Sequence, residues 1–198
     1  MAAAEKRRQI LDAAIHVFAR QGFHACRVSD IADEAGVAYG LVYHYFKSKD
    51  QMLNELFTER WSLLLHAIEE VDGRQIPGRE KLDAVAGFII DSYRHDPELM
   101  KVIIVEVTRA ANSFGRTHLP EIRRAYDMIA KIVADGQRSG TFRGDVDPEF
   151  ASMWFYGAIE QLLSGWVFEL IPGDEADFDR ARKMVVETIC GGLEAPAG

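Results

Sequence analysis

The apolar residues of this chain recur at spacings of three and four positions, the period of amphipathic helices, along most of its length. Turn-forming residues interrupt the pattern, and no stretch alternates in the way a half-buried strand does. The sequence therefore predicts an all-α protein with nine main helices. They cover approximately residues 2–21, 28–35, 38–46, 48–71, 80–95, 97–111, 120–139, 148–170 and 177–192.

The eighth predicted helix, residues 148–170, is apolar on more than one face. A helix of this kind needs two packing partners. We assign one face to its own domain and the other to a second subunit, which the small side chains of Gly157, Ala158 and Gly165 would allow to approach closely. The alternative is that this helix and the last one, 177–192, only complete the core of a monomer.

A short segment, residues 28–49, has the pattern of two helices joined by a tight turn. Gly36 lies at the turn, where a residue that readily adopts positive φ can end the first helix. Val42 and Phe46 lie four residues apart on the inner face of the second helix. Four residues then point outward: Tyr39, Gly40, Tyr43 and His44. Exposed aromatic rings beside a glycine are unusual on a solvated face, but they suit a helix that lies in the major groove of DNA.

The charge of the chain is unevenly distributed. Its net charge of −8 argues, taken alone, against a nucleic-acid binder. Residues 1–49 nevertheless carry seven Lys and Arg against five acids, whereas the remainder carries sixteen against twenty-six. A slightly basic head on an acidic body fits a small DNA-reading domain joined to a second domain. Within the head, the run Lys6-Arg7-Arg8 is either a solvated helix start or a flexible basic arm near the DNA backbone.

The run GVAYGLVYHYFKSKDQML, residues 36–53, resembles the helix-turn-helix signature of the TetR family of transcriptional repressors. The match includes both glycines, the aromatic cluster and the pair of lysines, and ILDAAIHVFARQGF at residues 10–23 resembles the first helix of the same domain. Three positions, Ala38, Tyr39 and Leu41, depart from the commonest family pattern. Because such positions usually face DNA, the preferred base sequence does not carry over from the family.

The resemblance implies a DNA-binding surface centred on the third helix. The residues expected to face the groove or its walls are Ala38, Tyr39, Gly40, Leu41, Tyr43 and His44. Those expected mainly to hold the DNA backbone are Arg27, Ser29, Tyr45 and Lys49. Two alternatives stay open at this point, because Ser29 also suits a helix cap and Tyr45 also suits inward packing.

The family implies two domains, a DNA-binding domain over residues 1–49 and a helical effector-binding and dimerisation domain over residues 50–198. A homodimer would read a near-palindromic operator and release it when an effector binds one of two states preferentially. The interface is expected in the last two helices of each subunit, at Ala158, Leu162, Gly165, Trp166, Met184, Val185, Thr188 and Ile189. Activation of transcription, in place of repression, is the alternative.

Large aromatic residues are frequent in the predicted second domain, and most of them should simply pack its core. The family adds a cavity between the middle helices, with an expected lining of Trp61, Leu65, Phe88, Tyr93, Ile104, Val107, Arg109, Phe155 and Gln161. The phrase FYGAIEQLLSGWVFEL, residues 155–170, resembles the fatty-acid-responsive, acyl-CoA-binding branch of the family. It favours a long apolar effector such as an acyl-CoA, and the alternative is a hydrophobic drug-like or cationic ligand.

No catalytic constellation is recognisable in the sequence, which has no glycine-rich phosphate loop, zinc-protease motif or nucleophile elbow. Cys26 and Cys190 are far apart, and His24 beside Cys26 does not make a metal-ligand spacing. We expect a regulator without metal or cofactor, the alternative being a helical enzyme that carries a helix-turn-helix. No apolar run approaches the roughly twenty residues that span a membrane, and no export signal is recognisable, so the expected location is the cytoplasm.

Overall fold

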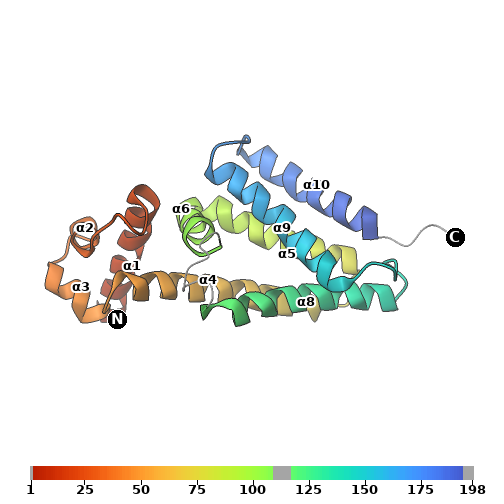
Figure 1. The fold of residues 1–198 in the computed structure, drawn as a ribbon, viewed down its shortest axis with the longest axis horizontal. Coiled ribbons are helices and arrows are strands. Elements are labelled where there is room, and N and C mark those ends of the chain that lie inside the picture. Colours follow the sequence, from red (N-terminus) through yellow and green to blue (C-terminus); the bar gives the residue numbers. More distant parts are fainter. Residues whose placement is uncertain (1, 109–116, 194–198) are drawn as a thin grey trace. The chain divides into compact units, whose positions relative to one another are not determined.

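The structure is a computed structural model, and it describes residues 2–108 and 117–193 (Figure 1). These residues form helices α1 Ala2–Gln21, α2 Val28–Glu34, α3 Tyr39–Tyr45, α4 Lys49–Asp72, α5 Gly78–His95, α6 Pro97–Val102, η1 Ile103–Thr108, α8 Leu119–Arg138, α9 Pro148–Val167 and α10 Glu175–Leu193. The segment η1 is a π-helical turn that continues α6 directly. Counting the two as one gives nine helices and no strand in the described ranges, so the prediction of an all-α fold is confirmed.

The helix ends follow local sequence signals. The Asp96 carboxylate accepts a hydrogen bond from the Leu99 amide at the start of α6, and Asp147 accepts from the amides of Glu149 and Phe150 at the start of α9. Helix α9 ends at Val167, three residues earlier than predicted. The reason is Glu169, which adopts a left-handed φ of 55° and turns the chain so that the Leu170 amide donates to the Gly165 carbonyl at 2.8 Å.

The chain divides into two compact units, which we call the N-terminal unit, residues 1–60 and 96–116, and the C-terminal unit, residues 61–95 and 117–198. This division by compactness differs from the predicted functional domains, because the segment that begins with α6 belongs with the N-terminal helices. The predicted boundary between DNA-binding and effector-binding functions stays a prediction.

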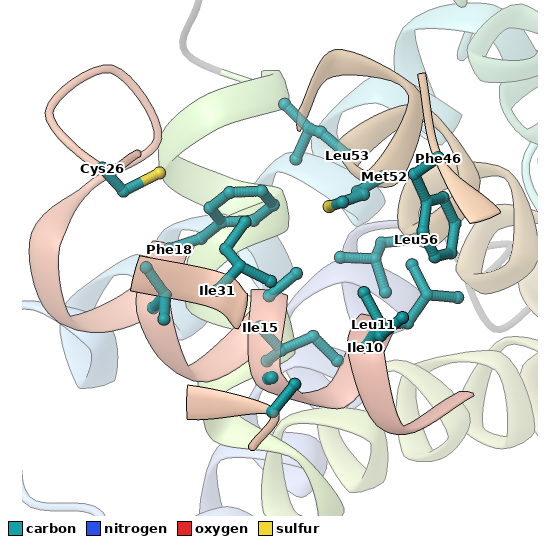
Figure 2. Close-up of a cluster of buried hydrophobic side chains, with 14 of the residues drawn as sticks. Ile10, Leu11, Ile15, Phe18, Cys26, Ile31, Phe46, Met52, Leu53 and Leu56 are labelled. Atoms are coloured by element: carbon teal, nitrogen blue, oxygen red, sulfur yellow. The ribbon is translucent and has the colours of Figure 1, made fainter. Parts of the chain in front are cut away.

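The core of the N-terminal unit is formed by the apolar stripes of α1 to α4 (Figure 2). Helix α1 contributes Ile10, Leu11, Ile15 and Phe18, and these side chains meet Ile31 of α2 and Met52, Leu53 and Leu56 of α4. Val102 of α6 belongs to the same buried cluster. The three-helix head and the end of α6 therefore share one hydrophobic core, and this core fixes the orientation of α3.

In the C-terminal unit, α5, α8, α9 and α10 pack against one another. One end of this packing is an aromatic cluster in which the Trp166 ring stacks on Tyr93, with centroids 5.6 Å apart, and meets Phe178 edge-on at 4.8 Å. The Trp166 indole N–H donates to the Pro172 carbonyl at 2.8 Å. Burial of the rings, with the indole donor satisfied, fixes the turn between α9 and α10.

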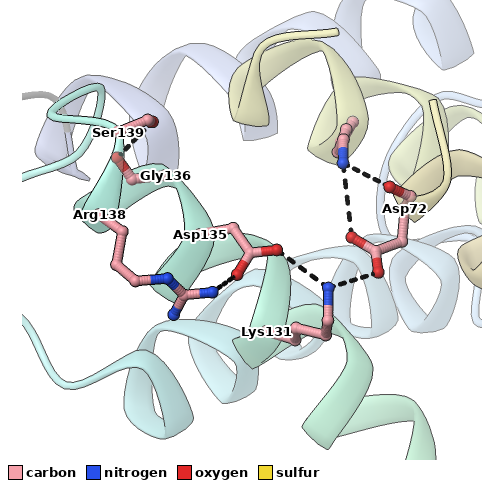
Figure 3. A network of polar contacts seen from close by, with 7 residues as sticks. Asp72, Lys131, Asp135, Gly136, Arg138 and Ser139 are labelled. Carbon is pink, nitrogen blue, oxygen red and sulfur yellow. Dashed lines mark hydrogen bonds and ion pairs between the residues drawn. The ribbon is translucent and has the colours of Figure 1, made fainter. Parts of the chain in front are cut away.

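A group of charged side chains joins the end of α4 to α5 and α8 (Figure 3). The Asp72 carboxylate accepts from Lys131 at 2.8 Å, and Lys81 donates to the Asp72 carbonyl at 2.5 Å. Lys131 also donates to Asp135 at 2.9 Å, and Asp135 accepts from Arg138. Although partial burial works to raise the pKa of Asp72, these cationic partners hold it below its usual value.

Candidate nucleic-acid interface and effector-binding residues

The turn between α2 and α3 is closed by backbone hydrogen bonds. The Gly36 amide donates to the Asp33 carbonyl at 3.1 Å, and the Val37 amide donates to the Ala32 carbonyl at 3.0 Å. Gly36 has φ +61°, a conformation that suits a residue without a Cβ. The Val37 side chain packs against the core of the N-terminal unit, so the turn presents α3 at a fixed angle.

The two faces of α3 differ sharply in burial. Val42 and Phe46 are 0% and 1% exposed, whereas Tyr39 and Tyr43 are 53% and 45% exposed. The other exposed residues of the predicted DNA-binding set are Arg27, Ala38, Gly40 and His44, and its half-buried members are Ser29, Leu41, Tyr45 and Lys49. Open space lies where a Cβ on Gly40 would point, so a DNA backbone can approach α3 closely at that position.

The structure decides between the alternatives that the sequence left open for the half-buried residues Ser29 and Tyr45. Arg27 is the N-cap of α2, and its amide donates to the Asp30 carboxylate at 2.8 Å. Ser29 therefore lies inside the first turn and is not the cap of the helix. Tyr45 packs partly against the core of the N-terminal unit, which is the inward packing that the sequence left open.

Tyr39 and Tyr43 form a pair on the exposed face of α3. Their ring centroids are 5.2 Å apart in an edge-to-face arrangement, and their hydroxyl oxygens lie 3.2 Å apart, within hydrogen-bond distance. The contact raises the pKa of the Tyr43 phenol above its ordinary value.

Lys49 has a structural contact that sequence reasoning missed. Its ammonium donates to the backbone carbonyls of Phe23 at 2.6 Å, Cys26 at 3.0 Å and His24 at 3.2 Å, and it lies 4.8 Å from the Phe23 ring centroid. The lysine thus holds the loop between α1 and α2 against the start of α4. No local signal predicts this contact, because the partners are more than twenty residues apart in the sequence. Contact between Lys49 and DNA stays a prediction.

The charges of α1 are mostly paired. Arg7 forms an ion pair with Glu55, Arg8 with Asp12 at 2.8 Å and Arg20 with Glu34 at 2.8 Å. Because Lys6, Arg7 and Arg8 lie within α1, the reading of this run as a helix start holds, and the flexible-arm alternative does not. Arg27, the N-cap of α2, and Lys47, two residues after the end of α3, are both exposed.

The predicted effector residues do not all belong to one unit. Trp61, Leu65 and Phe155 are buried in the C-terminal unit, and Phe88 and Tyr93 are half-buried there. Ile104 is buried in the N-terminal unit, and Gln161 is exposed on α9. Arg109 and the side chain of Val107 lie outside the described residues.

The structure also adds two aromatic neighbours to Trp61. The Trp61 ring lies 6.2 Å from Tyr156, and Tyr156 lies 5.3 Å from Tyr126 in an edge-to-face contact. The Trp61 indole N–H donates to the Glu121 carbonyl at 2.9 Å. Burial, with a smaller contribution from nearby Glu160, raises the pKa of Tyr126. Helical spacing alone could not separate these rings from ordinary core residues.

The residues predicted for the dimer interface differ in burial. Trp166 and Val185 are 4% and 6% exposed within their own subunit. A Cβ at Gly165 would lie 2.9 Å from the Ile171 side chain. These three therefore pack inside the subunit, and their helical spacing reflects its core. Ala158, Leu162 and Ile189 are half-buried, whereas Met184 and Thr188 are exposed.

The turn of residues 35–38, closed by backbone hydrogen bonds, and the exposed polar-aromatic face of α3 define a helix-turn-helix protein of the DNA-binding type. Comparison with known families agrees. The family described as bacterial regulatory proteins, tetR family, matches residues 10–56, and the family described as tetracyclin repressor-like, C-terminal domain, matches residues 79–189. The chain belongs to the TetR family, and it is a TetR-type transcriptional regulator.

Two curated relatives and one solved structure resemble the chain over almost its whole length. The chain is 31% identical to the fatty acid metabolism regulator protein of Bacillus subtilis over 95% of both chains. It is 26% identical to the transcriptional repressor KstR2 of Rhodococcus jostii, over 96% of this chain and 92% of that protein. The crystal structure of FadR from Bacillus subtilis in complex with stearoyl-CoA superposes with a TM-score of 0.81 and 28% identity, covering 94% of this chain and 99% of that one.

The family and these relatives are named as transcriptional regulators, not as enzymes. Among the helices that the structure describes, none is both long enough and apolar enough to cross a membrane.

Proposed function

We propose that this chain is a repressor that binds a near-palindromic DNA operator as a homodimer and releases it when a long-chain acyl-CoA binds. The proposal assigns DNA binding to residues 1–49 and effector binding and dimerisation to residues 50–198. Since the operator would be chromosomal, the proposed location is the cytoplasm.

The observation that carries the DNA-binding proposal is the exposed face of α3. Buried Val42 and Phe46 fix the helix, while Tyr39 and Tyr43 are 53% and 45% exposed and do not belong to the hydrophobic cluster of the described N-terminal helices. The exposed cations Arg27 and Lys47 flank this face in the sequence. Large rings and cations around a glycine suit contacts to phosphates and groove walls.

The effector proposal is supported by likeness and by composition. The 31% identical relative is named a fatty acid metabolism regulator, and the superposed FadR structure is a complex with stearoyl-CoA. In this chain the proposed lining of the C-terminal unit is apolar or aromatic at Trp61, Leu65, Phe88, Tyr93 and Phe155. Such a lining favours an acyl chain over a small polar effector.

The dimer proposal is supported by exposed apolar side chains on the last two helices. Phe150, Met153 and Trp154 of α9 are 60%, 56% and 62% exposed, and Met184 of α10 is 59% exposed. Clustered large apolar side chains in water are typical of protein interfaces. The exposed and half-buried members of the predicted set, Ala158, Leu162, Met184, Thr188 and Ile189, would extend this surface.

The test begins with selection of a duplex from a random DNA pool by the purified protein. Its affinity is then measured by fluorescence anisotropy with stearoyl-CoA, free CoA, stearate or tetraphenylphosphonium present. We expect stearoyl-CoA to weaken binding by about tenfold or more, as is usual for allosteric coupling, and free CoA to have no effect. Selective release by tetraphenylphosphonium would replace the acyl-CoA proposal with a cationic effector. Failure to enrich any duplex would contradict the DNA-binding proposal itself.

A further inference from the structure

The Lys49 side chain is directed back from the start of α4 to the loop of residues 22–27, which joins α1 to α2. Among the described residues it donates three hydrogen bonds, to the carbonyls of Phe23 at 2.6 Å, Cys26 at 3.0 Å and His24 at 3.2 Å. A lysine ammonium has three N–H donors and no acceptor. The donor capacity of Lys49 is therefore filled within the N-terminal unit.

The surroundings of the Lys49 ammonium favour this position. The group lies 4.8 Å from the centroid of the Phe23 ring, and the face of an aromatic ring attracts a cation. Phe23 and Cys26 are buried. Lys49 is also the first residue of α4, where the positive end of the helix dipole disfavours a cation, and the carbonyl oxygens offset that effect. The ammonium must break at least one of its three bonds before it can donate to a DNA phosphate.

We infer that Lys49 is a positioning residue for DNA binding, whose ammonium holds the loop before α2 in place and does not contact a DNA phosphate. The inference rests on the proposed function and deepens it, because the sequence alone placed Lys49 among the residues that hold the DNA backbone. Cys26, whose carbonyl Lys49 binds, immediately precedes Arg27, the exposed N-cap of α2. Since α2 packs against α3, the anchored loop also fixes the position of α3.

The inference has a consequence for the salt dependence of DNA binding. A cation that neutralises a phosphate releases a counterion, so each such contact adds about 0.9 to the slope of log affinity against log salt concentration. Loss of one phosphate contact in each subunit of a dimer would lower the slope by about 1.8. Loss of a positioning residue lowers the affinity but leaves the slope unchanged.

The first test is Lys49→Met, which removes the ammonium and keeps an unbranched side chain. Affinity for a duplex selected by the wild-type protein is measured between about 50 mM and 200 mM salt. Because the lost bonds are charge-assisted, we expect binding to weaken by about threefold or more at every salt concentration, with the wild-type slope. Lys101→Met is the matched control, since it removes an exposed cation of α6 outside the predicted DNA-binding set and should change neither quantity.

Thermal melts establish that the Lys49→Met variant is folded at the assay temperature. A slope lowered by about 1.8 would show that Lys49 contacts a phosphate and would overturn the inference. An unchanged affinity in the folded variant would also overturn it, because Lys49 would then stabilise the fold without positioning the DNA-binding elements.

A second test uses the wild-type protein and needs no variant. Acetylation of each lysine by N-hydroxysuccinimidyl acetate is followed by mass spectrometry, with and without the selected duplex. We expect Lys49 to react at least about tenfold more slowly than exposed Lys47 in the free protein, since its amine must first leave strong hydrogen bonds. Equal reaction of the two lysines in the free protein, with DNA protecting Lys49, would overturn the inference and leave the proposed function standing. A wild-type protein that binds no duplex would overturn both.

Discussion

At the scale of single residues, Phe142 packs closely against two glycines of the C-terminal unit. Its ring is 2% exposed and rests on the Cα atom of Gly136 in α8, and it also contacts Gly78 at the start of α5. A Cβ at Gly78 would lie 2.9 Å from the Phe142 ring, and one at Gly136 would collide with it. Gly136, in the last turn of α8, is therefore needed for space and not for its backbone conformation, because its φ is not in the left-handed region.

Gly136→Ala should destabilise the protein, since the added methyl group displaces the Phe142 ring. Overpacking of this kind costs roughly 1–3 kcal/mol, which outweighs the gain of up to about 1 kcal/mol from replacing a helical glycine. Urea unfolding measures the difference. Gly191→Ala in α10 is the control, because nothing lies within 4 Å of its Cβ position. Equal stabilities for the two variants would contradict the role of Phe142.

Asp72 is a residue that should contribute to the acid sensitivity of the fold. Its pKa in the folded state is held below the usual value by Lys131 and Lys81, against the effect of burial. Its stabilising contribution is therefore complete above the unfolded-state pKa of about 4. This contribution is lost as the pH falls through the lower folded-state pKa.

Asp72→Asn should therefore lower stability at pH 7 by about 1 kcal/mol. Stability measured from pH 7 down to pH 2 should fall less steeply in the variant than in the wild type, so the two curves converge in acid. The exposed ion pair between Arg143 and Asp145 provides the control. Asp145→Asn should change stability much less than Asp72→Asn does. Parallel pH curves for the wild type and Asp72→Asn would exclude the proposed linkage.

At the scale of secondary-structure elements, the sequence pattern predicts helix ends and helix faces correctly where the residues responsible lie within one helix or turn. Gly36, Asp96 and Asp147 mark helix ends that the structure contains. The outward face of α3 followed from the spacing of Val42 and Phe46. The exposed positions of Tyr39, Gly40, Tyr43 and His44 agree with that spacing, although their role in DNA binding remains a prediction.

Contacts between distant segments could not be predicted in this way. The spacing of Trp166 and Val185 could not distinguish the core of a subunit from an interface, because both require apolar residues at helical intervals. The bonds of Lys49 to the loop between α1 and α2 join segments that sequence periodicity does not relate. The π-helical turn η1 likewise has no signature in a pattern that reads only apolar and polar positions.

One such long-range contact joins η1 to the helix-turn-helix region. The Glu106 carboxylate accepts a hydrogen bond from the backbone amide of Phe23 at 3.1 Å, within the N-terminal unit. Phe23 is thus held on both sides, its amide by Glu106 and its carbonyl by Lys49. Because a shielded amide without an acceptor is costly, this bond should influence the stability of the loop.

Glu106→Ala should destabilise the N-terminal unit by roughly 1–3 kcal/mol, whereas Glu106→Gln should have a smaller effect because its amide oxygen can still accept. Hydrogen exchange at the Phe23 amide provides a local measurement, and we expect faster exchange only in the Ala variant. Unchanged exchange in Glu106→Ala would show that the bond does not hold the loop.

At the scale of the whole molecule, the proposed function requires two copies of the chain, since a near-palindromic site presents two equivalent half-sites. The residues best placed to join the copies are the exposed Trp154 and Met184. A tryptophan that becomes buried at the centre of an interface commonly contributes a large part of the binding free energy.

Trp154→Glu should weaken self-association at least about tenfold, because it replaces a buried ring with a charge at the interface. Sedimentation equilibrium measures the dissociation constant of the dimer. Leu63→Glu is the matched control, since Leu63 is 55% exposed on α4 and lies outside the proposed interface. A wild-type protein that sediments as a monomer, or a dimer equally tight in both variants, would contradict the proposed surface.

Both native thiols are inaccessible, and this has a practical consequence. Cys26 and Cys190 are 3% and 0% exposed, and burial raises the pKa of the Cys26 thiol, so maleimide reagents should leave the folded protein unmodified. A single cysteine introduced by Lys47→Cys at this exposed position can then carry a spin label while both natural cysteines are kept. Electron paramagnetic resonance on such a dimer would measure the separation of the two heads directly, with and without a candidate inducer.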